Sequence, residues 1–234
     1  MTAPHAAPET AYVLQTWPWK ETSLLVELFT QGQGKILVVA RGAKRPASHF
    51  KGLVTPLVKL SVRYAGTGEI RNLTHAELAA APLALEGDAL FLAFYVNELI
   101  VRLLAREDPY GALFDDYEEV LADLAAGARP EVALVRFEGR LLRHLGYALP
   151  EDTMTWVWDA LGMHAFDAEA AYGQDAVFIT PEMNRAIGSE AYDEAEVLAF
   201  AKRLFRQMLA FYVGDRPLSS RRILQKLKTL ENPS

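Results

Sequence analysis

A cluster of positive charge follows a short apolar run near residue 40. Five basic side chains lie within eleven residues that contain no carboxylate: Arg41, Lys44, Arg45, His49 and Lys51. Cations held close together repel one another unless water or an anionic partner offsets the repulsion. A phosphate backbone is such a partner, so the cluster predicts a nucleic-acid contact. The same residue types are also typical of a solvated hairpin tip whose lysines protect a sheet edge.

The residues before the cluster, Gln31–Gly34 and Lys35, resemble a phosphate-binding loop only superficially. Such a loop needs a further glycine five positions before Gly34 and a serine or threonine after the lysine. Phe29 and Ile36 occupy those two positions. We therefore exclude a nucleotide-binding loop here.

Other groups with catalytic potential are scattered. Four carboxylates, Asp115, Asp116, Glu118 and Glu119, fall on an expected helix, where they project around its axis as a solvated face. His164 has no second ligand at metal-binding spacing. The chain has no cysteine, which excludes disulfides and thiolate metal sites. No catalytic triad, HExxH pair or dinucleotide fingerprint is present, so we expect neither an enzyme nor a cofactor.

Composition indicates an ordinary globular protein. The 234 residues are 51% hydrophobic and 23% charged, and no apolar run approaches the length of a membrane span. The first ten residues have no basic region followed by an apolar one, so we expect a disordered tail over 1–10 rather than a signal peptide. The expected location is the cytoplasm.

The net charge of −6 conceals a strong asymmetry. Residues 1–80 contain 9 Lys and Arg against 5 Asp and Glu, and residues 201–234 contain 8 against 2. Residues 81–200 contain only 7 against 23. Two basic ends therefore flank an acidic middle, so a polyanionic partner stays possible although the net charge of the whole chain is negative.

Five short strands are expected before residue 80: Ala11–Trp17, Ser23–Thr30, Lys35–Ala40, Leu53–Tyr64 and Glu69–Thr74. No helix-length crossover separates them, which favours a small antiparallel barrel over an open parallel sheet. Four aromatic residues lie near the basic cluster: Trp17, Trp19, Phe50 and Tyr64. Most are expected in the core, but Trp19 and Phe50 stand in turn contexts and are candidates for stacking on bases.

Beyond residue 81 the apolar period becomes helical. Helices are expected from Leu83 to Asp108, from Tyr110 to Ala126, from Pro130 to Gly146, after Asp193 through Val213, and over Pro217–Leu230. Residues 150–181 are irregular, with Ala176–Ile179 as a short strand or buried turn. The expected fold is α+β, with a five-stranded barrel over 11–80 and a helical domain over 81–234.

A second group of cations lies near the C-terminus. Lys202 and Arg206 are one helical turn apart, and Arg221 and Arg222 lie on the expected final helix. These side chains predict a surface for DNA or for an acidic protein segment.

Seven segments together resemble the RecO family of bacterial recombination mediators: ELFTQGQGK, ILVVARGAKRPAS, HFKGLVTPL, FYVNELIVRLL, LFDDYEEVLADL, VRFEGRLLRHLGY and LSSRRILQKL. The resemblance runs in order over nearly the whole chain. It implies an N-terminal oligonucleotide-binding (OB) barrel followed by an α-helical domain. It also implies binding of single- and double-stranded DNA, annealing of complementary strands, and help in replacing single-stranded DNA-binding protein with recombinase, without nucleotide hydrolysis.

The resemblance also implies partners and site residues. The partners would be RecR and the acidic C-terminal tail of single-stranded DNA-binding protein. DNA contacts carry over onto Lys35, Arg41, Lys44 and Arg45, and less specifically onto Arg221 and Arg222. Many members carry a four-cysteine zinc module after the LGY segment, which this chain lacks, so it would belong to a zinc-free subgroup.

Within this resemblance, the tail of single-stranded DNA-binding protein would bind Lys202, Arg206, Arg221 and Arg222, with its terminal ring against Phe211, Leu218 and Leu224. These apolar residues are also suited simply to pack the two helices together. Two other functions remain open from the electrostatics alone: an RNA-binding OB-fold protein in transcription or translation, and a scaffold whose basic ends dock on acidic protein.

Overall fold

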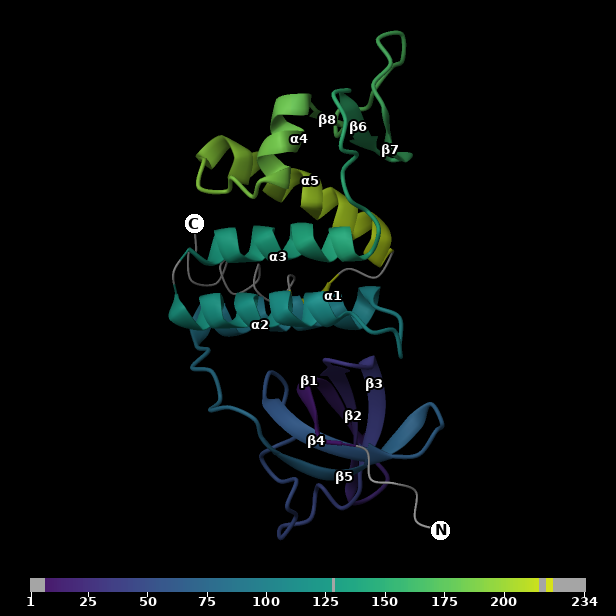
Figure 1. Ribbon diagram of the computed structural model, residues 1–234, viewed down its shortest axis with the longest axis vertical. Helices are drawn as coiled ribbons and strands as arrows, with labels where there is room; N and C mark the ends of the chain where they lie inside the picture. Colours follow the sequence, from purple (N-terminus) through teal and green to yellow (C-terminus); the bar gives the residue numbers. More distant parts are fainter. Residues whose placement is uncertain (1–6, 128, 215–217, 221–234) are drawn as a thin grey trace, which may run out of the picture. The chain divides into compact units, whose positions relative to one another are not determined.

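The computed structural model describes residues 7–127, 129–214 and 218–220. Residues 7–127 and 218–220 belong to one compact unit, and residues 129–214 belong to a second. The α+β class and the N-terminal five-stranded barrel are confirmed (Figure 1). The domain boundaries at residues 11, 80 and 81 stay a prediction. None of the helices in the described ranges is long and apolar enough to cross a bilayer.

The barrel closes in the order β1-β2-β3-β5-β4. Its strands are β1 (Glu9–Trp19), β2 (Ser23–Thr30), β3 (Gly34–Ala40), β4 (Lys59–Ala65) and β5 (Ile70–Leu78). Side chains from all five strands fill the barrel, alternating in and out along β2 and β3, and Val13, Val26, Val38 and Leu60 are fully buried inside it. All neighbouring strands are antiparallel except β3 and β5, so the antiparallel barrel expected from the sequence contains one parallel pair.

Several strand limits differ from the expected ones, and β5 continues to Leu78 instead of ending at Thr74 because Leu78 pairs with Leu60 of β4. β1 begins at Glu9, because Glu9 and Thr10 pair with β4, and residues 1–6 of the expected tail lie outside the described residues. β4 begins only at Lys59, because the preceding segment closes the barrel instead of continuing the strand. Leu57 N donates to Val13 O at 2.8 Å, and the Leu57 side chain is buried.

Helices α1 (Gly87–Leu103) and α2 (Gly111–Ala126) belong to the same unit as the barrel. Four aromatic rings join α2 to β1 and β2, with centroids 5.0–5.7 Å apart: Tyr12, Phe29, Phe114 and Tyr117. Asn97 on α1 donates to Leu14 O at 2.8 Å and accepts a hydrogen bond from the Tyr117 hydroxyl. Burial raises the pKa of that hydroxyl well above its ordinary value, so Tyr117 stays a hydrogen-bond donor.

α1 ends at Leu103, several residues before the expected stop, because the chain then runs back along the start of β3. Glu107 N donates to Lys35 O at 2.9 Å. Gly34 faces this return: a Cβ there would lie 1.8 Å from Asp108 O, and its φ of +67° also favours glycine. The glycine before Lys35 therefore permits close backbone packing rather than phosphate binding.

The chain returns to the first unit at its C-terminal end. The Glu98 carboxylate on α1 accepts hydrogen bonds from the backbone N–H groups of Ser219 and Ser220, both at 2.9 Å, and from the Ser220 hydroxyl at 2.6 Å. Burial alone would raise the pKa of the Glu98 carboxyl, but these hydrogen bonds outweigh it, and the net pKa lies below its ordinary value. The rest of the expected final helix lies outside the described residues.

We expect Glu98→Ala to lower the free energy of unfolding by about 1–2 kcal/mol at neutral pH, because the buried Ser220 loses its acceptor. A group with a depressed folded-state pKa stabilises the fold above its unfolded pKa. The contribution of Glu98 should therefore be lost as the pH falls below about 4.5. Urea unfolding at neutral and acidic pH measures both effects. Asp115→Ala on the exposed face of α2 is the control, and equal losses in the two variants would contradict the assignment.

The second unit packs α3 (Pro130–His144) against α5 (Ala195–Val213), with α4 (Pro181–Gly188) beside α5. Gly139 on α3 allows close contact, since a Cβ there would lie 2.9 Å from the Phe205 ring on α5. The stretch expected to be irregular contains a three-stranded antiparallel sheet in the order β7-β6-β8. Its strands are β6 (Trp156–Asp159), β7 (Gly162–Ala165) and β8 (Val177–Ile179).

Several helix limits in the sequence prediction are confirmed, but α4 was not predicted. α2 ends before Gly127, which is left-handed, and α3 begins at Pro130. α5 extends to Val213 as expected, but its N-cap is Glu194. Asp193 instead forms an ion pair with Arg129, and is therefore not the N-cap that the sequence indicated.

Candidate nucleic-acid interface

The basic loop, residues 41–51, carries the predicted cations at the surface. Arg41, Lys44, Arg45, His49 and Lys51 are all exposed. None of them forms an ion pair with a carboxylate in the part of the chain that the structure describes. The structure therefore brings together five of the six residues predicted to contact DNA, and leaves their charge open to solvent or to an anion.

The basic loop is held by a series of turns and by three buried side chains. Ala43, Phe50 and Val54 belong to the barrel core. Backbone hydrogen bonds from Arg45 N to Gly42 O, at 2.9 Å, and from Ser48 N to Arg45 O, at 3.0 Å, define the turns. Because the loop is anchored at both ends of the cationic run, its charges occupy a defined surface.

Phe50 is a correction to the sequence prediction. Its turn context suggested a ring exposed for stacking, but only 2% of the residue is exposed. The turns fold the ring back into the end of the barrel, where His49 covers it with ring centroids 3.8 Å apart. Phe50 therefore positions the loop and does not offer a stacking surface.

Two tryptophans beside the basic loop are exposed. Trp17 and Trp19 lie on the outer face of β1 and are 37% and 38% exposed. Trp17 is opposite Leu25 on β2, which in turn is opposite Val39 on β3. Directly opposed residues share a face of the sheet. The end of the outer face of β1-β2-β3 that carries these residues is therefore an aromatic and apolar surface, whereas Tyr12 and Phe29 on the same face are covered by α2.

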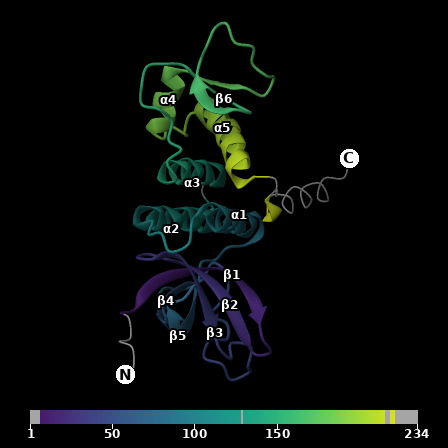
Figure 2. The same cartoon turned by 90° about the vertical axis from the view of Figure 1, so that its right-hand side faces the viewer.

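The aromatic face and the basic loop are contiguous. Lys44 N donates to Thr22 O at 2.9 Å, and Gly42 N donates to Ser23 Oγ at 3.4 Å. Ser23 is the partner of Trp19 across the β1–β2 hairpin. Both features lie at the end of the barrel away from α1 and α2 (Figure 2). Cations next to aromatic rings combine phosphate neutralisation with base stacking, which is how OB barrels bind single strands.

The exposure of Trp17 was not predicted, although Trp19 was singled out. The i, i+2 spacing of the two tryptophans on one strand places them on the same face. That spacing was the available signal in the sequence. It could not tell which face the helices leave uncovered.

Lys35 is the second correction. Only 5% of the residue is exposed, and its Nζ donates to Val101 O near the C-terminal end of α1. Burial lowers the pKa of the Lys35 ammonium, Glu27 opposes this shift, and Arg106 adds to it. An ammonium enclosed in this way does not reach a phosphate. Lys35 ties β3 to α1 and does not lie on the exposed surface of the basic loop.

Glu27 completes this buried polar group. Its carboxylate is almost fully buried, accepts a hydrogen bond from Gln15 Nε2 at 2.7 Å, and lies 3.3 Å from Arg106 Nη2. A buried carboxylate is tolerated when it is paired and hydrogen-bonded in this way. The cluster is a structural connection between the barrel and the segment after α1.

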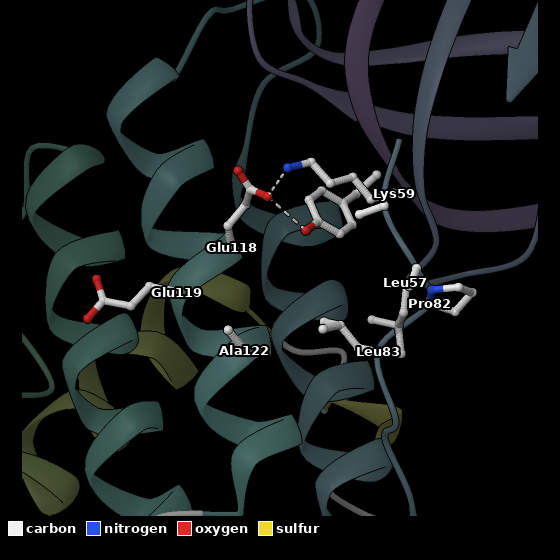
Figure 3. Close-up of a pocket in the computed structure, with 10 residues that line it drawn as sticks. Leu57, Lys59, Pro82, Leu83, Glu118, Glu119 and Ala122 are labelled. Atoms are coloured by element: carbon white, nitrogen blue, oxygen red, sulfur yellow. Dashed lines mark hydrogen bonds and ion pairs between the residues drawn. The ribbon is translucent and has the colours of Figure 1, made fainter. Parts of the chain in front are cut away.

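Glu118, one of the four carboxylates predicted on α2, is bonded to residues of the barrel. Glu118 accepts a hydrogen bond from the Tyr12 hydroxyl at 3.0 Å and pairs with Lys59 of β4. Figure 3 shows Glu118 pointing toward Lys59 at the edge of a pocket of about 420 Å³, which Leu57 and Leu83 also line. Within the described residues no group of three or more His, Cys, Asp or Glu side chains is arranged to hold a metal ion. Glu118 therefore acts as a tether between α2 and the barrel.

The predicted C-terminal cations do not form one described cluster. Lys202 pairs with Glu131 of α3 at 2.7 Å, and Arg206 on the same helix is exposed. Arg221 and Arg222 lie outside the described residues, as does Leu224. Of the apolar residues, Phe211 is 52% exposed and Leu218 is buried. The partner-binding surface stays a prediction.

Comparisons with known proteins show which family the chain resembles. The family model described as "Recombination protein O N terminal" matches residues 6–82, and "Recombination protein O C terminal" matches residues 84–155. Proteins named "DNA repair protein RecO" are similar to the chain over nearly its whole length. The one from Azoarcus sp. (strain BH72) is 35% identical over 95% of this chain and 96% of its own.

Two further relatives have the same name. The relative from Nitrosospira multiformis is 38% identical over 94% of this chain and 95% of its own length. The relative from Burkholderia pseudomallei is 37% identical over 96% of this chain and 85% of its own length. The family matches meet on either side of residue 83, where the barrel gives way to the helices. The chain belongs to the RecO family of DNA repair proteins.

Proposed function

We propose that this chain acts in recombinational DNA repair by binding single- and double-stranded DNA through the basic loop and the exposed end of the outer face of β1-β2-β3 that carries Trp17 and Trp19. One observation carries the proposal: five exposed cations without described ion-pair partners adjoin two half-exposed tryptophans. The cations suit phosphates, and the rings suit unpaired bases. Membership of the RecO family supports DNA as the polyanion rather than RNA.

The same surface supports annealing of complementary strands. Two approaching strands repel each other through their phosphates, and a cationic loop lowers that repulsion. Stacking on Trp17 and Trp19 would hold a strand in an extended conformation with its backbone along the loop. No nucleotide is needed for either effect, which is consistent with the absence of a phosphate-binding loop at Gly34.

Matched oligonucleotides test this proposal directly. We expect the protein to bind single-stranded DNA, to bind duplex DNA, and to accelerate annealing of complementary DNA strands without ATP. RNA of the same sequence is the comparison. Tighter binding to RNA, without DNA annealing, would contradict the proposal and favour the RNA-binding alternative.

The affinity for single-stranded DNA should fall steeply with salt. Neutralising a phosphate releases condensed counterions, with a slope of about −0.7 per contact in single strands. Four or five contacts from the basic loop predict a log–log slope of about −3. Fluorescence anisotropy over a range of salt concentrations measures it. A slope near zero would show that stacking alone provides the binding.

We further propose that the chain cooperates with RecR and with the acidic C-terminal tail of single-stranded DNA-binding protein, so that recombinase replaces that protein on DNA. For the tail, exposed Arg206 and the exposed ring of Phe211 on α5 are the supporting residues. Lys202 would first have to leave Glu131. Arg206→Glu should weaken binding of a labelled tail peptide about tenfold and leave bare-DNA binding unchanged. Equal losses for peptide and DNA would argue for one shared surface.

A further inference from the structure

The outer face of the β7-β6-β8 sheet in the second unit carries a cluster of aromatic rings. Val157 on β6 is opposite His164 on β7 and Phe178 on β8, so the three share one face. Phe166 and Tyr172 join them, with the Tyr172 ring centroid 5.8 Å from that of Phe166 and 5.2 Å from that of Phe178. The opposite face, which includes Trp158, is buried. The sheet therefore has one core face and one aromatic face.

The aromatic face is held in place but not covered. The Tyr172 hydroxyl accepts from Asp167 N at 2.7 Å and donates to Asp167 O at 3.0 Å, which closes the segment between β7 and β8. Val157 beneath the rings is fully buried. Phe166 and Phe178 nevertheless remain 44% and 41% exposed. Rings that are fixed and still exposed indicate a surface used for contact.

Acidic residues predominate around this face. Between residues 144 and 184 the sequence has seven Asp and Glu residues and no lysine or arginine. Asp167, Glu169 and Asp175 are exposed, and none of them forms an ion pair with a described residue. The Arg203 guanidinium of α5 reaches this region, but it donates to the Ala176 carbonyl at 3.2 Å and forms no ion pair with these carboxylates. Asp167 Oδ1 accepts a hydrogen bond from Glu169 N at 2.9 Å, which leaves its second oxygen for a cation.

We propose that the aromatic face of the β7-β6-β8 sheet, with Asp167 and Glu169 at its edge, binds an arginine-bearing cationic segment of a partner protein. The guanidinium group is planar and weakly hydrated, so it stacks on aromatic faces while it pairs with neighbouring carboxylates. Nucleic acid is the wrong occupant, because the carboxylates repel phosphates. The site is thus opposite in sign to the basic loop and goes beyond the proposed DNA binding.

The experiment uses the full chain and two labelled peptides. One peptide carries arginines separated by glycine and serine, and the other carries the same number of lysines in the same positions. Fluorescence anisotropy at low ionic strength should show several-fold tighter binding of the arginine peptide. Phe166→Ser with Phe178→Ser should weaken arginine-peptide binding about 5- to 30-fold and remove the preference for arginine. Asp167→Lys with Glu169→Lys should weaken both peptides roughly tenfold.

Asp115→Lys with Glu69→Lys is the matched control, because it makes the same change in net charge at exposed sites of the first unit. This variant should bind both peptides nearly as wild type does. Near-ultraviolet circular dichroism checks that every variant keeps its folded core. Losses in the control equal to those in the sheet variants, or no effect of removing the two phenylalanines, would overturn the proposal.

One further result would overturn it. If the chain self-associates at low salt, and Arg41→Glu with Arg45→Glu abolishes the association, then the occupant of the face is the basic loop of a second copy. Analytical ultracentrifugation of the wild type and this variant settles the point. A monomer under the peptide-binding conditions supports a separate cationic partner.

Discussion

Replacing Arg41 and Arg45 with glutamate should reduce the affinity for single-stranded DNA on the order of 100-fold at moderate salt. Each replacement removes a phosphate contact and introduces a repulsive charge at a fixed position of the basic loop. The salt slope should also flatten by about 1.4, from the two lost contacts. Both arginines are exposed, so the fold should be unaffected.

Arg63→Glu with Arg185→Glu is the control for this result. It makes the same change in net charge at exposed positions outside the basic loop. We expect at most a fewfold loss of DNA affinity and an unchanged salt slope, measured by the same anisotropy titrations. If this control loses as much affinity as the loop variant, then overall charge rather than the basic loop determines binding.

Replacing Trp17 and Trp19 with alanine should weaken single-strand binding at least about 30-fold, since stacking on an aromatic ring contributes about 1–3 kcal/mol per base. Duplex binding should change much less, because paired bases do not expose their faces to these rings. The salt slope should stay as in the wild type. This contrast separates stacking from phosphate contact within one continuous surface.

Conservative replacement makes the tryptophan prediction specific. Trp17→Phe with Trp19→Phe retains aromatic faces and should recover most of the affinity. Leu78→Ala on β5, another exposed apolar residue, should have no effect. Equal losses of single-strand and duplex affinity in the alanine variant would show that the tryptophans support the loop and do not stack on bases.

The elements of the fold were predictable where local pattern decides them. β2, the end of α2 before Gly127 and the start of α3 at Pro130 follow from strand alternation, a left-handed glycine and a proline at the first helical turn. The basic loop was predictable for the same reason, because Gly42 and Pro46, which interrupt regular structure, lie among its basic residues in the sequence.

The remaining features depend on distant contacts. Lys35 is buried because its ammonium donates a hydrogen bond to the carbonyl of Val101, 66 positions away, and no local sequence pattern predicts that contact. Phe50 stands in a turn, which normally exposes a ring, but the turns of the basic loop direct it into the barrel. The exposure of Trp17 depends on where the two helices cover the barrel, which strand alternation alone does not specify.

The hydrogen bonds of Ser219 and Ser220 to Glu98 have a consequence for biosynthesis. They join residues about 121 positions apart, on either side of the entire second unit. A ribosome adding about 5–20 residues per second needs roughly 6–24 s to pass from one partner to the other. During that interval α1 emerges from the ribosome without the contact that satisfies Glu98. Nascent chains stalled before residue 218 should therefore bind chaperones more than chains stalled well beyond it.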